Sequence, residues 1–183
     1  MANYNFDRFT VLVVDENSYM RSLMTMALKA LGIGTVKTAK DGGDAIDLLR
    51  LMEQNPMKAG MLSVDIVFSA WDMSPVDGMM LLRWIRRHKE SPDRFIPFVM
   101  VTGHGEPDDI REMRDMGVTE VLAMPFSVNS VASRLLQVVD RPRQFVHTSD
   151  YFGPDRRRQN LPSDLPERRV LTDDHPQVEI VYD

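Results

Sequence analysis

Two acidic side chains stand side by side at the end of the first apolar run of the chain. Asp15 and Glu16 follow Thr10–Val14, which is short and rich in β-branched residues, as buried strands are. Carboxylate oxygens are ligands that Mg²⁺ prefers, but two carboxylates without a third usually make only a weak magnesium site. We therefore expect two solvated carboxylates at a strand end, with a weak magnesium site at Asp15 and Glu16 as the alternative, and no required cofactor.

A hydroxyl group and an imidazole follow a later apolar run. Phe95–Thr102 has the composition of a strand and ends at Gly103-His104-Gly105. A histidine with neither a nucleophile nor a metal partner is usually an ordinary loop residue, so we assign His104 no catalytic role. We expect the Thr102 hydroxyl to hydrogen-bond within its own loop. The chain has no cysteine, which excludes thiol nucleophiles and thiolate metal sites.

These side chains need a scaffold that brings strand ends together. Over residues 9–140, five apolar segments alternate with five segments of helical periodicity, a pattern that predicts a parallel sheet with helices on both faces. We predict an α/β, flavodoxin-like (βα)5 fold, in which the side chains at the carboxyl ends of the strands meet in one crevice. The expected strands are Thr10–Val14, Thr35–Thr38, Met61–Ala70, Phe95–Thr102 and Glu120–Met124, and the expected helices span residues 17–32, 42–56, 78–89, 107–117 and 127–139.

Composition and charge limit the classes of function. The chain of 183 residues is 43% hydrophobic and 27% charged, as expected of a globular protein with a real core. Its formal net charge of −5 opposes a general attraction to nucleic acid, so we expect no nucleic-acid partner. No apolar run approaches the roughly 20 residues that a membrane span needs, and the first residues lack the pattern of a secretory signal. We therefore expect a cytoplasmic protein.

Residues 141–183 differ in composition from the segment before them. They hold five of the eleven prolines and show no sustained period, so we expect an irregular, Pro/Arg-rich extension without a packed core, poorly ordered or docked on a partner. Its end, Val178–Tyr182, could add an edge strand to the domain or to another chain. The side chains expected to contact a partner are Arg156, Arg157, Arg158, Arg168 and Arg169.

Four segments, in order, resemble the CheY-like receiver domains of bacterial two-component response regulators. They are VLVVDEN, DIVFSAWDMSPVDGMMLLRWIR, VMVTGHG and AMPFS, and the resemblance identifies residues 9–140 as a receiver-like domain. In that family, two acids after the first strand and an aspartate after the third hold magnesium, and this aspartate takes a phosphoryl group from a histidine kinase. A Thr or Ser after the fourth strand and a Lys after the fifth contact the phosphoryl oxygens.

The chain departs from the family at two of these positions. Asp15, Glu16 and Thr102 match retained positions, but Ala70 stands at the phosphoacceptor position and Met124 at the lysine position. A methyl group cannot be phosphorylated. A buried lysine without its carboxylate would be an unpaired charge, and methionine has similar length without that charge. We therefore expect a pseudo-receiver, which is not an enzyme and acts by protein–protein interaction without phosphorylation.

Other functions stay open. One is a functional phosphorelay receiver that is phosphorylated at Asp72, two residues past Ala70, or at another carboxylate. A second is binding of nucleic acid or membrane through the extension, although each of its arginine pairs lies beside an acid. The GPDRRR and PERR segments resemble tails of some alphaproteobacterial receiver proteins, and no function comes with that resemblance. The expected partners are signalling proteins, such as a histidine kinase or another receiver, and a homodimer is a further alternative.

Overall fold

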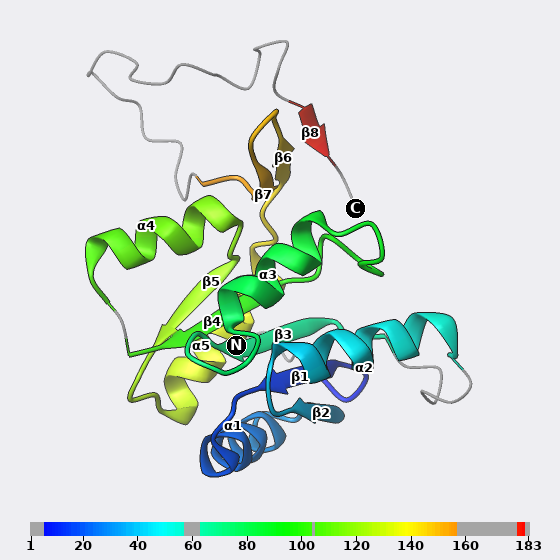
Figure 1. Cartoon of the computed structure of the whole chain (residues 1–183). Helices are drawn as coiled ribbons and strands as arrows, with labels where there is room; N and C mark the ends of the chain where they lie inside the picture. The colour runs from blue at the N-terminus through cyan, green and yellow to red at the C-terminus, as the bar shows by residue number, and fades with distance from the viewer. Residues whose placement is uncertain (1–5, 57–62, 104, 157–178, 182–183) are drawn as a thin grey trace.

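Five short strands form one parallel sheet at the centre of the molecule (Figure 1). The computed structural model describes residues 6–56, 63–103, 105–156 and 179–181. The strands of the sheet, whose order is β2-β1-β3-β4-β5, are β1 (Thr10–Val14), β2 (Thr35–Ala39), β3 (Ile66–Ala70), β4 (Phe98–Thr102) and β5 (Glu120–Ala123).

The three central strands are buried on both faces, which explains their nearly continuous apolar sequences. Successive side chains of a strand point to opposite faces, so each strand contributes to two separate cores. In β1, for example, Leu12 and Val14 belong to one core, whereas Val11 and Val13 belong to the other. Two strands begin later than predicted, since β3 starts at Ile66 and β4 follows Pro97, which has no N–H for a sheet ladder.

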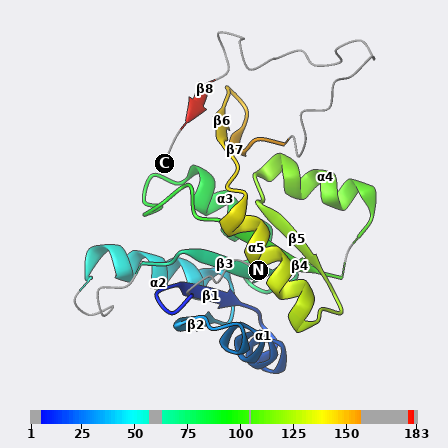
Figure 2. The same ribbon diagram turned by 180° about the vertical axis from the view of Figure 1, so that it is seen from behind.

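Five helices cover the two faces of the sheet. The core on one face is completed by α1 and α5, and the core on the other face by α2, α3 and α4 (Figure 2). Asn17, Asp41, Asp77 and Ser127 cap four of the helices through their side chains. The helices are α1 (Ser18–Ala30), α2 (Gly42–Gln54), α3 (Gly78–Arg87), α4 (Pro107–Met116) and α5 (Val128–Asp140).

This architecture is the predicted flavodoxin-like fold. Because all five strands are parallel, their carboxyl ends lie at one edge of the sheet and their amino ends at the other. We call these the carboxyl edge and the amino edge. Within the described part of the chain, every helix is too short or too polar to cross a bilayer.

Part of the extension forms a second, antiparallel sheet of order β7-β6-β8. Its strands are β6 (Phe145–His147), β7 (Phe152–Pro154) and β8 (Glu179–Val181). Both views place this sheet far from α1 (Figures 1 and 2). A strand does form within Val178–Tyr182, but it pairs with β6 of the extension, whereas the sequence suggested an edge of the domain or another chain.

The expectation that no packed core follows Asp140 is wrong for residues 145–154. Phe145, Tyr151 and Phe152 are buried. The ring of Phe95, which precedes β4, lies 5.0 Å from the Phe145 ring and 5.4 Å from the Phe152 ring between centroids. The pattern was missed because these aromatic residues are few, aperiodic and distant in sequence from their partner. A hairpin of the extension therefore packs on the domain itself.

Candidate functional site

The acidic pair lies at the carboxyl edge, directly after β1. The backbone N–H of Asn17 donates to Asp15 Oδ1 at 2.8 Å, and Arg21 Nη1 donates to the backbone oxygen of Asp15 at 2.6 Å. Asp15 is half-buried, and this burial raises the pKa of its carboxyl group against the lowering effects of the Asn17 N–H and the Arg21 charge. The exposed Glu16 accepts a hydrogen bond from the backbone N–H of Ser74 at 3.1 Å. The loop after β3 thus meets the acidic pair.

Ala70 is the last residue of β3, and its side chain is buried beside the acidic pair. A cavity of about 10 Å³ is lined by Ala70, Asp15 and Phe126, together with apolar residues of β1, β3, β4 and α1. That volume is at the lower limit for a single water molecule. The position where the resemblance places a phosphoacceptor thus carries a methyl group in closely packed, largely apolar surroundings.

The loop from Ala70 to Gly78 leaves no room for a shift in register. The Gly78 N–H donates to the backbone oxygen of Trp71 at 2.8 Å, and Asp77 caps the N-terminus of α3 by accepting from the Met80 N–H at 2.7 Å. A Cβ atom at Gly78 would lie 2.1 Å from the Ala70 backbone oxygen, so only glycine permits this approach. Both ends of the loop are therefore fixed, with Ala70 at the end of the strand.

Thr102 is the last residue of β4, and Met124 directly follows the neighbouring strand β5 at the same edge of the sheet. Thr102 is buried, and its backbone oxygen accepts the N–H of Met124 at 2.8 Å. The Met124 side chain is 38% exposed, and its terminal methyl lies near Gly103. The lysine position of the resemblance is therefore occupied by a partly exposed, uncharged thioether. Asp15, Ala70, Thr102 and Met124 do meet at one edge, as the parallel topology predicts.

The acidic pair gains no third carboxylate. Asp72 is exposed, and among residues 6–56, 63–103, 105–156 and 179–181 no group of three or more His, Asp or Glu side chains could hold a metal ion. The described residues therefore do not fit the full magnesium site that the family uses, and the weak site at Asp15 and Glu16 stays a prediction. His104 lies outside the described residues.

The arginines of the extension are only partly described. Arg156 forms an ion pair with Asp115 of α4, with 2.8 Å between Nη1 and Oδ1, and its guanidinium lies 4.2 Å from the centroid of the Tyr151 ring. Arg156 therefore contacts the protein's own domain. Arg157, Arg158, Arg168 and Arg169 lie outside the described residues, so their predicted contact with a partner stays a prediction.

A second polar constellation, at the amino edge, was missed by sequence reasoning. Arg86 at the end of α3 is fully buried, and it donates to the backbone oxygens of Gly117 (3.0 Å), Arg94 (2.7 Å) and Ile96 (2.8 Å). Burial lowers the pKa of its guanidinium to about 10, so Arg86 remains charged at neutral pH. The available signal was its helical spacing, four residues after Leu82 on the apolar side of α3.

The hairpin of the extension covers this buried arginine. The Arg86 guanidinium lies 5.2 Å from the centroid of the Phe145 ring, and that of Arg94 lies 3.9 Å from the Phe152 ring. Arg143 Nη1 donates to the backbone oxygen of Thr119 at 2.9 Å, and its Nη2 donates to that of Asp155. The extension is thus bound to the amino edge by both aromatic packing and hydrogen bonds.

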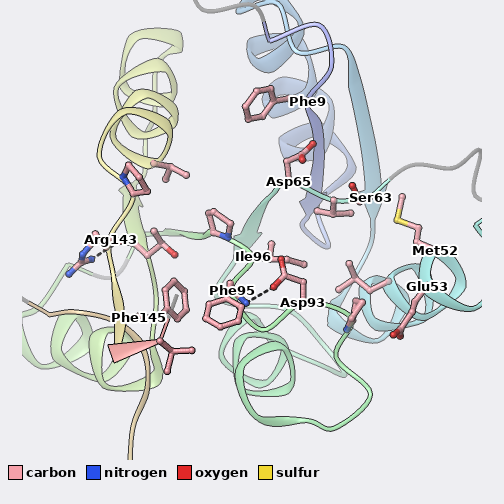
Figure 3. A pocket seen from close by; sticks show the side chains of 18 of the residues that line it. Phe9, Met52, Glu53, Ser63, Asp65, Asp93, Phe95, Ile96, Arg143 and Phe145 are labelled. Carbon is pink, nitrogen blue, oxygen red and sulfur yellow. Dashed lines mark hydrogen bonds between the residues drawn. The ribbon is translucent and has the colours of Figure 1, made fainter. Parts of the chain in front are cut away.

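A large pocket opens at the same edge (Figure 3). Its volume is about 750 Å³, and it lies between the amino ends of the sheet strands, the C-terminal ends of α2 and α5, and the extension. We call it the amino-edge pocket. It is lined by Phe9, Leu49, Met52, Glu53, Ser63, Val64, Asp65, Pro92, Asp93, Phe95, Ile96, Pro97, Thr119, Val138, Pro142, Arg143, Gln144, Phe145 and Val181.

The sequence of the domain is similar to those of known proteins. A family model described as the response regulator receiver domain matches residues 11–136. The chemotaxis protein CheY-3 of Vibrio cholerae is 27% identical over 131 residues, which cover 72% of this chain and 92% of that protein. The chemotaxis protein CheY homolog of Campylobacter jejuni is 29% identical over 129 residues, covering 70% of this chain and 91% of that protein.

Solved structures share the fold. Vibrio cholerae CheY4 is 25% identical with a TM-score of 0.58, covering 71% of this chain and 98% of that chain. The receiver domain of the histidine kinase CKI1 from Arabidopsis thaliana, complexed with Mg²⁺ and BeF₃⁻, is 26% identical with a TM-score of 0.63. That match covers 74% of this chain and 95% of the other.

Proposed function

The chain belongs to the response regulator receiver domain family, and from that premise we propose that it is a two-component signalling protein that works without phosphorylation. In this proposal the domain is a pseudo-receiver, which acts by binding other signalling proteins in the cytoplasm. The observation that carries the proposal is the buried methyl group of Ala70 at the end of β3, where the family has its phosphoacceptor.

The chemistry of aspartyl phosphorylation explains why the residue at position 70 is decisive for the proposal. The reaction needs a carboxylate oxygen as nucleophile, and cations that offset the charge of the transferring phosphoryl group. Ala70 supplies no nucleophile, and Met124 supplies no cation. The described acidic pair has no third carboxylate to complete a magnesium site. Nucleophile, lysine and full metal site are thus missing together, which supports an inert site.

The surface formed by β5 and α5 supports a role in protein binding. Met124, Val128 and Leu136 are large hydrophobic side chains on or next to these elements, and they are 38%, 44% and 36% exposed. Val128 and Leu136 are eight residues apart in α5 and so lie on a similar side of this helix, and an exposed apolar face is typical of interaction surfaces. We propose that this face contacts a signalling partner, such as a histidine kinase, another receiver or a second copy of the chain. The arginines that follow Arg156 are proposed as a further docking segment.

The direct test is incubation of the full-length protein with acetyl phosphate and Mg²⁺, followed by intact-mass measurement. The proposal expects no added phosphoryl group. The matched variant Ala70→Asp/Met124→Lys, which restores both charged side chains, tests whether the remaining scaffold still supports the reaction. A single phosphoryl group on the wild-type protein that is absent from Asp72→Ala would overturn the proposal and favour a receiver phosphorylated at Asp72.

A further inference from the structure

The amino-edge pocket lies at the edge of the sheet opposite to the acidic pair, so it belongs to a different site. Its walls are mainly apolar, with Phe9, Phe95 and Phe145 from three separate segments (Figure 3). A volume of about 750 Å³ is in the range of pockets that bind ligands. Phe145 belongs to β6, so this strand forms part of the wall of the pocket.

The edge of β6 that faces away from β7 already accepts an added strand. β8 pairs with it in antiparallel register through three residue pairs, Phe145↔Val181, Val146↔Ile180 and His147↔Glu179. The imidazole of His147 lies 3.5 Å from the carboxylate of Glu179. β8 thus shows in the chain itself that an extended segment can bind here, as in β-strand addition between proteins.

The contact that β8 makes is small. Its side chains are exposed or only partly buried, and residues 155–178 separate it from β7. Only three residue pairs join β8 to β6. Val181 reaches the wall of the amino-edge pocket, which still has about 750 Å³ of volume. A longer strand with a larger apolar side chain would therefore make more contacts than β8 does.

The charges around the pocket favour a basic occupant. The lining holds three carboxylates, those of Glu53, Asp65 and Asp93, against one guanidinium, that of Arg143. Each of the two aspartates accepts a backbone N–H, Asp65 from Thr10 at 2.7 Å and Asp93 from Phe95 at 2.7 Å, and Asp93 also interacts with the charge of Arg86.

The Arg143 guanidinium is turned to backbone oxygens of Thr119 and Asp155. The acidic side of the pocket therefore outweighs its basic side.

We propose that the amino-edge pocket and the β6 edge together form a docking site for an extended segment of a partner protein that is both apolar and basic. The segment displaces β8, pairs with β6, places an apolar side chain beside Phe145 and sets a Lys or Arg near Asp65. In the free protein β8 covers the β6 edge and competes with the partner. This site does not depend on the chemistry of Ala70.

The test uses the full-length protein and a fluorescein-labelled ten-residue peptide in which Val and Phe alternate with Lys. Proline at position 180 removes a backbone N–H and the strand geometry of β8, whereas Ile180→Thr keeps strand propensity. We expect the peptide to bind Ile180→Pro about tenfold more tightly than wild type or Ile180→Thr by fluorescence anisotropy. Ile180 is only partly buried, so all three proteins should unfold at similar urea concentrations.

Two further arms test the charge and the pocket. A matched peptide with Glu in place of Lys should bind at least tenfold more weakly, and Glu53→Gln/Asp65→Asn should remove most of that difference. Ser63→Trp, at an exposed position of the pocket lining, should weaken binding by filling the pocket. Equal affinity of the Lys peptide for Ile180→Pro and wild type, or equal affinity of the two peptides, would overturn the proposal. A dimer of Ile180→Pro that binds neither peptide would also overturn it, in favour of a second copy as the occupant.

Discussion

The two edges of the sheet differ in their polar side chains and in the size of their cavities. At the carboxyl edge, Ala70 and Met124 stand where the resemblance to receivers predicts a nucleophile and a cation, and the cavity beside Ala70 measures about 10 Å³. At the amino edge, Arg86 is buried under a hairpin of the extension beside a pocket of about 750 Å³. The scaffold is the same at both edges, so the contrast rests on a few side chains and an added segment.

This contrast suggests which edge of the sheet contributes more to the stability of the fold. A receiver fold can lose its reactive residues without losing its core, because the strands are held by apolar packing on both faces of the sheet. The buried hydrogen bonds of Arg86, in turn, tie the end of α3 to the segments before β4 and β5. We infer that the amino edge and its hairpin contribute more to stability than the carboxyl edge does.

The largest effect is expected from Arg86→Met. The change leaves the backbone oxygens of Gly117, Arg94 and Ile96, of which the first and last are buried, without their donor. We expect the free energy of unfolding to fall by about 3–5 kcal/mol in urea denaturation. The control is Arg83→Met, at an exposed arginine of the same helix, whose change should cost about 0.5 kcal/mol. Similar losses of unfolding free energy in the two variants would contradict the claim that the amino edge contributes most to stability.

A smaller loss is expected from Gly153→Ala in the hairpin. An added Cβ atom would lie 2.7 Å from Gly117 Cα and 2.7 Å from Tyr151 Oη. Because one of these atoms is backbone, the hairpin must shift, and we expect a loss of about 1–3 kcal/mol in thermal or urea unfolding. Gly105→Ala, whose Cβ would meet no atom within 4 Å, should be nearly neutral. A neutral Gly153→Ala would mean that the hairpin is not closely packed on the domain.

Ala70→Asp tests whether an added carboxylate at the carboxyl edge creates a magnesium site. A third carboxylate beside Asp15 and Glu16 should destabilise the metal-free protein by about 1–2 kcal/mol through like-charge repulsion and burial. Added Mg²⁺ should recover that loss by binding the folded state, which thermal unfolding with and without MgCl₂ would show. Ala70→Asn provides the uncharged control. The same increase in thermal stability with Mg²⁺ in the wild-type protein would show that Asp15 and Glu16 alone already bind the metal ion.

The smallest effect is expected from Asp15→Asn, and it depends on pH. Burial raises the folded-state pKa of Asp15 above 3.8, so the folded protein holds this proton more tightly than the unfolded chain does. That contribution to stability is present at low pH and is lost as the pH rises through the folded-state pKa. The variant should therefore match wild type near pH 3 and exceed it slightly near pH 7 in urea midpoints. An advantage confined to low pH would contradict the burial effect.

The sequence predicted the sheet and the carboxyl edge well, for a physical reason. The strands and helices carry regular apolar periods, and parallel pairing forces Asp15, Ala70 and Thr102 to one edge once the order of elements is known. The strand starts at Ile66 and Phe98 were less predictable, because apolar character continues beyond the sheet ladder. Such boundaries depend on hydrogen-bond partners that a period does not reveal.

The amino edge could not be predicted in the same way. Arg86 looks like an ordinary charged residue of an arginine pair, and its burial depends on carbonyl groups of two other segments, the one before β4 and the one before β5. Phe145 and Phe152 lie in a segment rich in proline and polar residues, where two aromatic side chains carry no period. Their packing on Phe95 and Arg94 is a tertiary contact, so only the folded structure shows that this part of the extension has a core.

The most direct test of the account is the amide NMR spectrum of the full-length wild-type protein before and after addition of Mg²⁺ and beryllofluoride, a mimic of a phosphoryl group. Without an aspartate at the end of β3, the backbone signals of Asp15, Trp71 and Thr102 should keep their positions beyond the effect of Mg²⁺ alone. Saturable shifts of these three signals that require beryllofluoride would show a working phosphoacceptor at the carboxyl edge and would contradict the account.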